Sequence, residues 1–271
     1  MSTISGGQVC TRTGVYLLPA RGEDGYRVTK DRYVRSGGVN SARENVHVGP
    51  LPADVIEDRG RFDTLGRTVY FADSAEVAFA EVLQGFRRTR VAIAPDAEAA
   101  GVSYEEYLEA VTTEAQNNGR DVPWAVPCDW QMHRSIYRAE MPTQGWWVAI
   151  DHPMTHAALT EALAVDLYQL GYRGGAALHS GLLASDDRAL TTTVAEHVRA
   201  LVLADGSLPL GISFRSKTEV GRCWAFWNRR ADDGLDPSAN DPALREERNV
   251  DGPAFRYVAE LYELPVLGSR T

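Results

Sequence analysis

The feature that most constrains the fold is a strand-like run that leads at once into an amphipathic helix, between Thr68 and Phe86. Thr68–Ala72 reads TVYFA, and β-branched and aromatic residues of this kind favour an extended strand. Asp73 can cap the helix that follows, and Glu76 three residues later completes a capping-box-like pair. This direct succession of strand and helix predicts a mixed fold built around the unit.

Further elements are expected on both sides of this unit. The strand-like runs are Val15–Leu18, Tyr26–Val28, Arg90–Ala94, Trp146–Asp151, Gly211–Ser216 and Arg222–Asn228. The helical runs are Ser103–Asn117, Thr155–Leu170, Asp186–Ala204 and a last short helix that starts near Pro253. Residues 118–145 and 229–250 read as irregular, and the first of these is rich in tryptophan and proline, as in a lid or an insertion that packs down. There is no internal repeat and no clear linker, so we expect one α+β domain over residues 1–271.

The composition limits the classes of partner. Lys and Arg number 28 against 37 Asp and Glu, and the resulting net charge of −9 argues against general nucleic-acid binding. A local basic pocket for a small phosphorylated ligand is still allowed. No apolar segment approaches the roughly 20 residues that a membrane span needs. The N-terminus also lacks an apolar core of signal-peptide length, so a cytoplasmic protein without membrane contacts is expected.

Several common kinds of site lack their sequence signals. The three cysteines, Cys10, Cys128 and Cys223, are far apart and show no CxxC spacing, so neither a disulfide framework nor a zinc site is indicated. His152 and His156 have HxxxH spacing, but no third ligand is evident and no metal site is expected. The chain also has no P-loop, no GxGxxG and no GxSxG motif.

Glu81 stands in the middle of the predicted helix. On a helical wheel Phe79, Leu83 and Phe86 share one side with Val82, and Glu81 falls on the opposite side. One interpretation is a solvent-facing glutamate. The other is the floor of a cleft, because the neighbours on its side are mostly small and uncharged: Val77, Ala80, Gln84 and Gly85. A carboxylate in a cleft could hold sugar hydroxyls or stabilise positive charge that develops on a ribose carbon.

Three further residues just before the helix bear on this choice. Arg61 and Arg67 lie just before the strand, and two arginine forks suit a diphosphate, although both could equally be solvated loop residues. Tyr70 sits in the middle of the strand, where it is either a core residue or a ring that stacks on a flat ligand at the edge of a site.

Together these residues resemble the centre of the RES domain family. The stretch GRFDTLGRTVYFADSAEVAFAEVL is similar to the family's GGRWN-like turn, its tyrosine-bearing strand and its glutamate-bearing helix, with RGRFD as a variant of the turn. Later, SDDRALTTTVAEHVRAL and GISFRSKTEVGRCWAFW resemble the family's C-terminal helix and last strands. The resemblance covers a core of about residues 26–228, with a Trp-rich insertion at about 118–147 and a C-terminal polar loop plus helix at 229–271.

The resemblance implies both a fold and an activity. The fold is that of ADP-ribosyltransferase toxins, a split mixed β core with helices around it. The implied activity is cleavage of the nicotinamide–ribose bond of NAD by a toxin of a toxin–antitoxin pair, with water or phosphate as the acceptor. NAD is then a substrate, no cofactor is needed, and the implied protein partner is a cognate antitoxin. The alternatives are a mono-ADP-ribosyltransferase that acts on a macromolecule and a non-catalytic nucleotide-binding module.

The resemblance also implies roles for individual residues. Glu81 matches the family glutamate and is expected to hold or polarise the ribose, Arg61 matches the arginine of the turn, and Tyr70 matches the strand tyrosine that faces the nicotinamide. The family's first arginine corresponds to Arg27 or Arg35, of which Arg27 fits the local pattern and Arg35 the expected distance. Of two candidates for the family serine we favour Ser216, and we expect Thr191 nearby.

Overall fold

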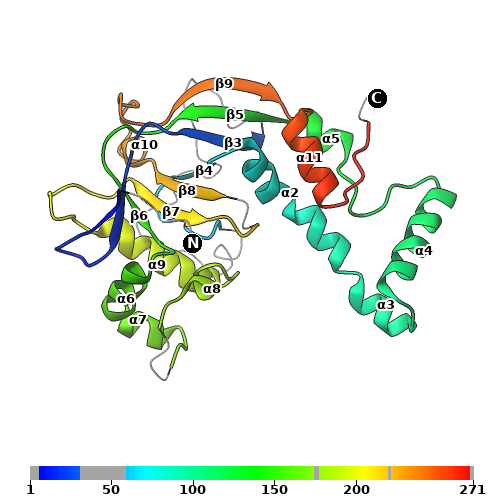
Figure 1. Cartoon of the computed structure of the whole chain (residues 1–271), viewed down its shortest axis with the longest axis horizontal. Coiled ribbons are helices and arrows are strands. Elements are labelled where there is room, and N and C mark those ends of the chain that lie inside the picture. Colours follow the sequence, from blue (N-terminus) through cyan, green and yellow to red (C-terminus); the bar gives the residue numbers. More distant parts are fainter. Residues whose placement is uncertain (1–5, 31–58, 174–176, 219–220, 269–271) are drawn as a thin grey trace.

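The computed structural model describes residues 6–30, 59–173, 177–218 and 221–268 (Figure 1). Its strands are β1 (Gln8–Val9), β2 (Tyr16–Pro19), β3 (Asp24–Lys30), β4 (Thr68–Ala72), β5 (Arg134–Glu140), β6 (Trp146–Ala149), β7 (Gly211–Arg215), β8 (Arg222–Trp227) and β9 (Ala243–Asn249). They form one sheet in the order β1-β2-β6-β7-β8-β4-β3-β5-β9. β6 and β7 pair in parallel and the other neighbours are antiparallel.

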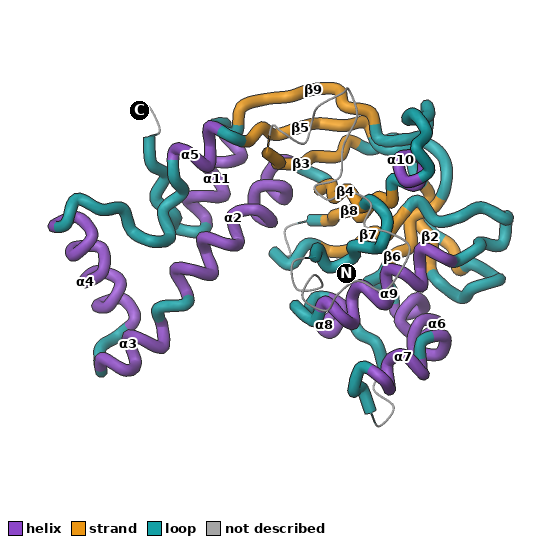
Figure 2. The backbone as a smooth tube through the Cα atoms, turned by 180° about the vertical axis from the view of Figure 1, so that it is seen from behind, coloured by secondary structure: helices purple, strands orange, loops and turns teal. Residues whose placement is uncertain are grey.

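The helices surround this sheet and extend from one end of it. They are α2 (Ala75–Val91), α3 (Ala94–Ala100), α4 (Tyr104–Asn117), α5 (Cys128–Met132), α6 (Pro153–Ala162), α7 (Ala164–Gln169), α8 (Ser180–Leu183), α9 (Arg188–Ala200), α10 (Arg229–Asp232) and α11 (Pro253–Leu261). Helices α6 to α9 gather beside β6 and β7, while α3 and α4 project away from the body at the far end of α2 (Figures 1 and 2). The predicted α+β class is thus confirmed. Among the described helices, none has both the length and the apolarity of a membrane span.

The sheet is almost divided between β3 and β4. β3 pairs with β5 along its whole length, but its register with β4 is a single pair, Tyr26 opposite Ala72. β4 in turn pairs with β8 through all five of its residues. Because this is the one pair between β3 and β4 in the described part of the chain, side chains from both strands can line a space beside it.

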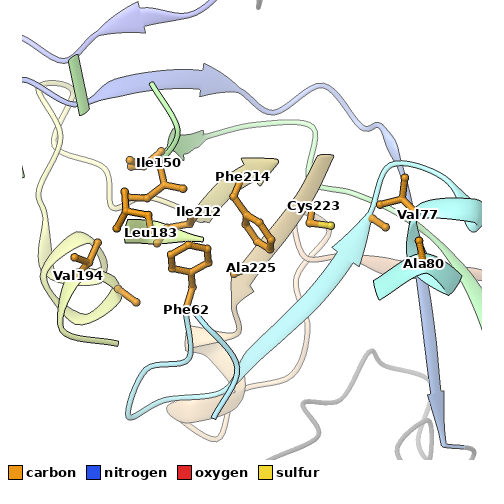
Figure 3. Packing of buried hydrophobic residues seen from close by; sticks show 14 of the residues in the cluster. Phe62, Val77, Ala80, Ile150, Leu183, Val194, Ile212, Phe214, Cys223 and Ala225 are labelled. Atoms are coloured by element: carbon orange, nitrogen blue, oxygen red, sulfur yellow. The ribbon is translucent and has the colours of Figure 1, made fainter. Parts of the chain in front are cut away.

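The main core lies between the sheet and the helices on one of its faces. Phe62 and Phe214 pack together with ring centroids 4.9 Å apart, and helix α9 contributes Val194 to the same cluster. Figure 3 shows Cys223 of β8 beside this cluster, on the side where Val77 of α2 packs. The turn before β4, the end of β7 and helix α2 are therefore held in fixed relation by buried apolar contacts, each of which removes apolar surface from water.

Helix α2 is longer than the sequence predicts. Ser74, not Asp73, is its N-cap, and the Ser74 hydroxyl accepts a hydrogen bond from the backbone N–H of Val77. The helix runs on to Val91, so the strand expected at Arg90–Ala94 is wrong. Val91 is 54% exposed. The β-branched residues of the run Arg90–Ala94 favour a strand locally. The backbone of the first of these residues nevertheless continues the hydrogen bonds of α2, and the run pairs with none of the described strands.

Two segments that read as irregular contain strands. β5 lies within residues 118–147 and β9 within residues 229–250, and the two pair with each other at the edge of the sheet. The later part of the Trp-rich segment therefore belongs to the main sheet, while Trp130 in its first part packs against Phe86 and Phe255. β5 buries every second residue, but these are Ser135, Tyr137 and Ala139, whose small or polar side chains give no strong apolar alternation.

Candidate functional site

A cavity of about 400 Å³ opens where β3 and β4 separate. Arg27 reaches it from β3, Tyr70 from β4 and Glu81 from α2. Arg61 lines it from the turn before β4, and Phe214 from β7 closes it on the core side. Five residues that are distant in sequence or belong to separate elements thus meet around one space, because the divided sheet leaves room there.

The cavity is basic although the chain is acidic. Its wall includes five cationic residues, and they are Arg27, Arg61, Arg88, Arg188 and Lys217. Among the described residues that line it, Glu81 is the one carboxylate. In a chain with a net charge of −9, this concentration of positive charge attracts anions to one place. The arrangement suits a phosphorylated ligand with a cationic or polarisable centre next to Glu81.

Glu81 is held from the end of β7. Its Oε1 accepts a hydrogen bond of 2.6 Å from the Ser216 hydroxyl and one of 3.1 Å from the backbone N–H of Lys217. The Ser216 hydroxyl also lies 2.6 Å from the hydroxyl of Thr218. Glu81 is half-buried in the cavity wall, so of the two interpretations of this glutamate the structure favours the cleft. Two donors fix the direction of its carboxylate before any ligand arrives.

Arg61 is almost buried, with 8% of its surface exposed. Its guanidinium lies over the rings of Phe214 and Phe62, at 4.9 and 5.5 Å from their centroids. Burial lowers the pKa of Arg61, and the nearby carboxylate of Glu81 opposes that shift. A guanidinium remains charged in proteins even so. The stacking therefore holds a cation in a fixed position at the edge of the cavity.

Tyr70 fastens the turn that carries Arg61. Its hydroxyl accepts a hydrogen bond from the backbone N–H of Phe62 at 3.0 Å and donates one to Asp63 at 2.8 Å. A Cβ at Gly60 would lie 2.5 Å from that hydroxyl, so the turn needs glycine at this position. Burial, followed by the charge of Asp63, raises the pKa of Tyr70 well above its usual value of 10.0. The hydroxyl thus has a structural partner on each side, while the ring faces the cavity.

We expect Tyr70→Phe to lower the free energy of unfolding by about 1–3 kcal/mol, because the buried N–H of Phe62 loses its acceptor. The pKa shift gives a second expectation. A folded-state pKa above 10.0 means that the stabilisation is complete below that pH and is lost as the pH rises beyond it. Denaturant titrations from pH 8 to 11 should show a decline above pH 10 that is smaller in Tyr70→Phe. Equal declines in both proteins would contradict this role for the hydroxyl.

The remaining predicted residues lie in different places. Arg27 lines the cavity, whereas Arg35 lies outside the described residues. Thr191 is fully buried in α9, and its hydroxyl donates to the backbone oxygen of Asp187. The structure brings Ser216, but not Thr191, to Glu81, because a threonine inside a helix readily bonds back to the preceding turn.

Arg67, the second arginine before the strand, is engaged away from the cavity. Its Nη1 donates to the backbone oxygen of Ala231 at 2.5 Å and lies 3.5 Å from the carboxylate of Asp232. Arg67 thus ties the start of β4 to helix α10, and it is not among the residues that line the cavity. Of the two arginines proposed for a diphosphate, Arg61 alone reaches the cavity.

The first histidine of the HxxxH pair, His152, has a structural role at the start of α6. The ring of His152 stacks on Tyr16 with centroids 3.8 Å apart, and its Nδ1 accepts a hydrogen bond from the backbone N–H of Met154. His152 is the N-cap of α6. Within the described parts of the chain, no three or more His, Cys, Asp or Glu side chains are grouped as metal ligands.

Three cationic residues of the cavity wall were not predicted from the sequence. Arg88 lies seven residues after Glu81, which is two helical turns and so the same face of α2. Lys217 follows Ser216 directly. With Glu81 and Ser216 as candidate site residues, these spacings would predict that Arg88 and Lys217 lie near the same site. Arg188, the first residue of α9, carries no such signal, because only the folded chain brings the start of that helix to α2.

A second cavity of about 380 Å³ adjoins the first. Arg61, Phe214 and Lys217 line both cavities, so these side chains form a shared wall. Ser216 faces the second cavity while it holds Glu81 in the first. The wall is therefore partly aromatic and partly cationic.

Family models, curated proteins and solved structures were each compared with this chain, and none of them matches it.

Proposed function

We propose that this protein degrades NAD by cleaving the bond between nicotinamide and ribose, with water or phosphate as the acceptor. The observation that carries the proposal is the hydrogen bond between Glu81 and Ser216 in a cavity lined by basic residues. These two residues are 135 positions apart in the chain. The sequence resemblance to the RES domain family singled out both of them.

The chemistry suits a site with one oriented carboxylate. The pyridinium of NAD is already a cationic leaving group, so the electron pair of the breaking C–N bond goes to nitrogen and neutral nicotinamide departs. Positive charge then develops on the ribose carbon, where the Glu81 carboxylate can stabilise it. An acceptor oxygen attacks that carbon, giving ADP-ribose and a proton from water, or ADP-ribose 1″-phosphate from phosphate. A carboxylate fixed in advance by Ser216 and the Lys217 N–H needs no reorganisation during this step.

The cavity wall also suits the rest of the dinucleotide. Basic side chains can neutralise the diphosphate through charge-assisted hydrogen bonds. Phe214 and the ring of Tyr70 offer aromatic surface to a flat heterocycle. Arg61 belongs to the basic part of the wall and is stacked on Phe214 of the aromatic part. Arg61 is therefore ordered before NAD binds, which favours the reactive geometry.

The test is to incubate the purified chain with NAD labelled in its adenine half, with and without phosphate, and to identify the products. The proposal predicts labelled ADP-ribose, or its phosphate ester when phosphate is present. Label retained on a macromolecule would favour a mono-ADP-ribosyltransferase instead. Binding of NAD without any product would favour a nucleotide-binding module.

The biological setting that we propose is a toxin restrained by an antitoxin that covers the cavity. Expression of the wild-type chain in bacteria should deplete cellular NAD and arrest growth. Expression of Glu81→Gln to the same level should do neither. Normal growth with unchanged NAD during wild-type expression would contradict a toxin role.

Ser216→Ala should lower kcat by about 10- to 100-fold and leave the KM for NAD within about threefold, because Ser216 positions Glu81 and supplies no binding charge. Ser216→Thr keeps the hydroxyl and should recover part of the rate. Steady-state kinetics of nicotinamide release measure both. A change in KM alone would show that Ser216 binds substrate and does not orient the carboxylate.

A further inference from the structure

A single exposed carboxylate, Asp186, joins three of the cationic residues that line the cavity. Its oxygens lie 2.5 Å from Lys217 Nζ, 3.1 Å from an Arg188 nitrogen and 3.6 Å from an Arg88 nitrogen. The three cations come from separate elements, which are the segment after β7, the start of α9 and the last part of α2. Asp186 itself lies in the turn before α9, with 59% of its side chain exposed.

The three cations are held close together in spite of their repulsion. Partial burial lowers the pKa of Lys217, Asp186 opposes that shift, and the charges of Arg61 and Arg188 add to the lowering. The hydrogen bond from Lys217 is the main cause that lowers the pKa of Asp186, so this carboxylate is ionised at neutral pH. Asp186 is thus the anion that this cluster of cations holds in the absence of a ligand.

We propose that Arg88, Arg188 and Lys217 form a binding site for phosphate oxygens at the rim of the cavity, and that Asp186 occupies this site as a counter-ion until a ligand displaces it. A diphosphate or an orthophosphate ion, taken as a whole, carries more negative charge than a carboxylate and offers more acceptor oxygens to the same donors. Identifying the ligand as the diphosphate of NAD rests on the proposed function, but the site itself does not.

The Asp186 side chain can move away from the three cations when another anion binds. The ion pair between Asp186 and Arg88 joins two exposed side chains and contributes little net stability, and the carboxylate itself is open to solvent on that side. The turn does not depend on its side chain, because Asp187 caps α9 by accepting from the backbone N–H of Leu190, and the Ser185 hydroxyl accepts from the N–H of Asp187. The Asp186 side chain can therefore rotate towards solvent without unfolding the start of α9.

The experiment measures binding of ADP and of orthophosphate to the full chain by calorimetry at low salt. Asp186→Asn removes the competing charge and should lower the Kd for ADP about three- to tenfold, with the gain shrinking as salt is added. The matched control is Asp236→Asn, which removes the same charge at an exposed residue that does not line this cavity and should leave the Kd unchanged. Unchanged or weaker ADP binding by Asp186→Asn would overturn the proposal.

A second pair of variants tests the cations directly. Arg88→Gln should raise the Kd for ADP at least threefold, whereas Arg120→Gln, at an exposed residue after α4, should not. Equal effects of the two changes would mean that general charge, and not this site, binds the ligand. The two ligands distinguish two sources of phosphate. A lower Kd for ADP than for orthophosphate assigns the site to the diphosphate of the dinucleotide. A lower Kd for orthophosphate assigns the site to the phosphate ion that acts as the acceptor.

NAD turnover measured on the same samples separates this inference from the proposed function. The predicted changes in ADP affinity without any NAD cleavage would support the anion site and contradict the enzymatic proposal. NAD cleavage with an ADP affinity that is identical in all variants would support the enzymatic proposal and contradict the anion site.

Discussion

Glu81→Gln should reduce the rate of nicotinamide release from NAD by at least about 100- to 1000-fold while the protein stays folded. The substitution keeps the size of the side chain and its ability to accept a hydrogen bond from Ser216, but it removes the negative charge. If positive charge develops on the ribose in the transition state, loss of that charge acts on the chemical step. We therefore expect the effect in kcat and only a small change in the Kd for NAD.

The matched control is Glu76→Gln in the same helix. Glu76 lies in the first turn of α2 and is not among the residues that line the cavity. The Glu76→Gln variant should retain wild-type turnover, and thermal unfolding of both variants should confirm that α2 is intact. A Glu81→Gln enzyme that cleaves NAD at the wild-type rate would remove Glu81 from the mechanism.

Phe214→Ala should have the largest effect on stability, lowering the free energy of unfolding by about 3–5 kcal/mol. Phe214 is 4% exposed, packs against Phe62 and lies under the guanidinium of Arg61. It also stands in the wall between the two cavities. Its removal should join the cavities and release Arg61 from its stacked position, so the residual folded protein should also lose NAD cleavage.

Phe226→Ala is the control that separates these two effects. Phe226 lies on β8, next to the strand of Phe214, and is also 4% exposed, but it packs with Trp147 in the separate cluster of buried residues. Its loss should cost a similar free energy of unfolding. At a temperature where both variants are folded, only Phe214→Ala should be impaired in turnover, and equal turnover would contradict the role of Phe214 in the site.

Much of the site could be predicted from the sequence because its parts belong to short, strongly patterned stretches. The strand Thr68–Ala72 is observed with the predicted bounds. It fixes Tyr70 directly and, through the helix that follows, Glu81. Ser216 comes one residue after the end of β7, where its hydroxyl reaches Glu81 of α2. Local propensity is informative in these places because tertiary packing agrees with it.

The rest depends on contacts that no local pattern records. β5 and β9 were missed because each is stabilised by its neighbour at the sheet edge more than by its own composition. The run at Arg90–Ala94 has the composition of a strand, but α2 continues through its first residues. The cluster of Arg88, Arg188 and Lys217 around Asp186 joins elements far apart in the chain, so its charges look like ordinary surface residues in the sequence.

Tyr70 has a structural role that the sequence did not predict. Its ring lines the cavity. Its hydroxyl, however, is committed to Phe62 and Asp63, and so Tyr70 also sets the position of Arg61. A sequence pattern can place a tyrosine on a strand but cannot show which turn its hydroxyl reaches.

The central claim is that this cavity cleaves the nicotinamide–ribose bond, and the most direct measurement is the release of free nicotinamide. Purified wild-type chain and Glu81→Gln should be incubated side by side with NAD, and nicotinamide and the remaining NAD quantified over time. We expect the wild-type chain to release one nicotinamide for each NAD lost and Glu81→Gln to release almost none. NAD that stays intact with the wild-type chain, in the presence and in the absence of phosphate, would contradict the central claim.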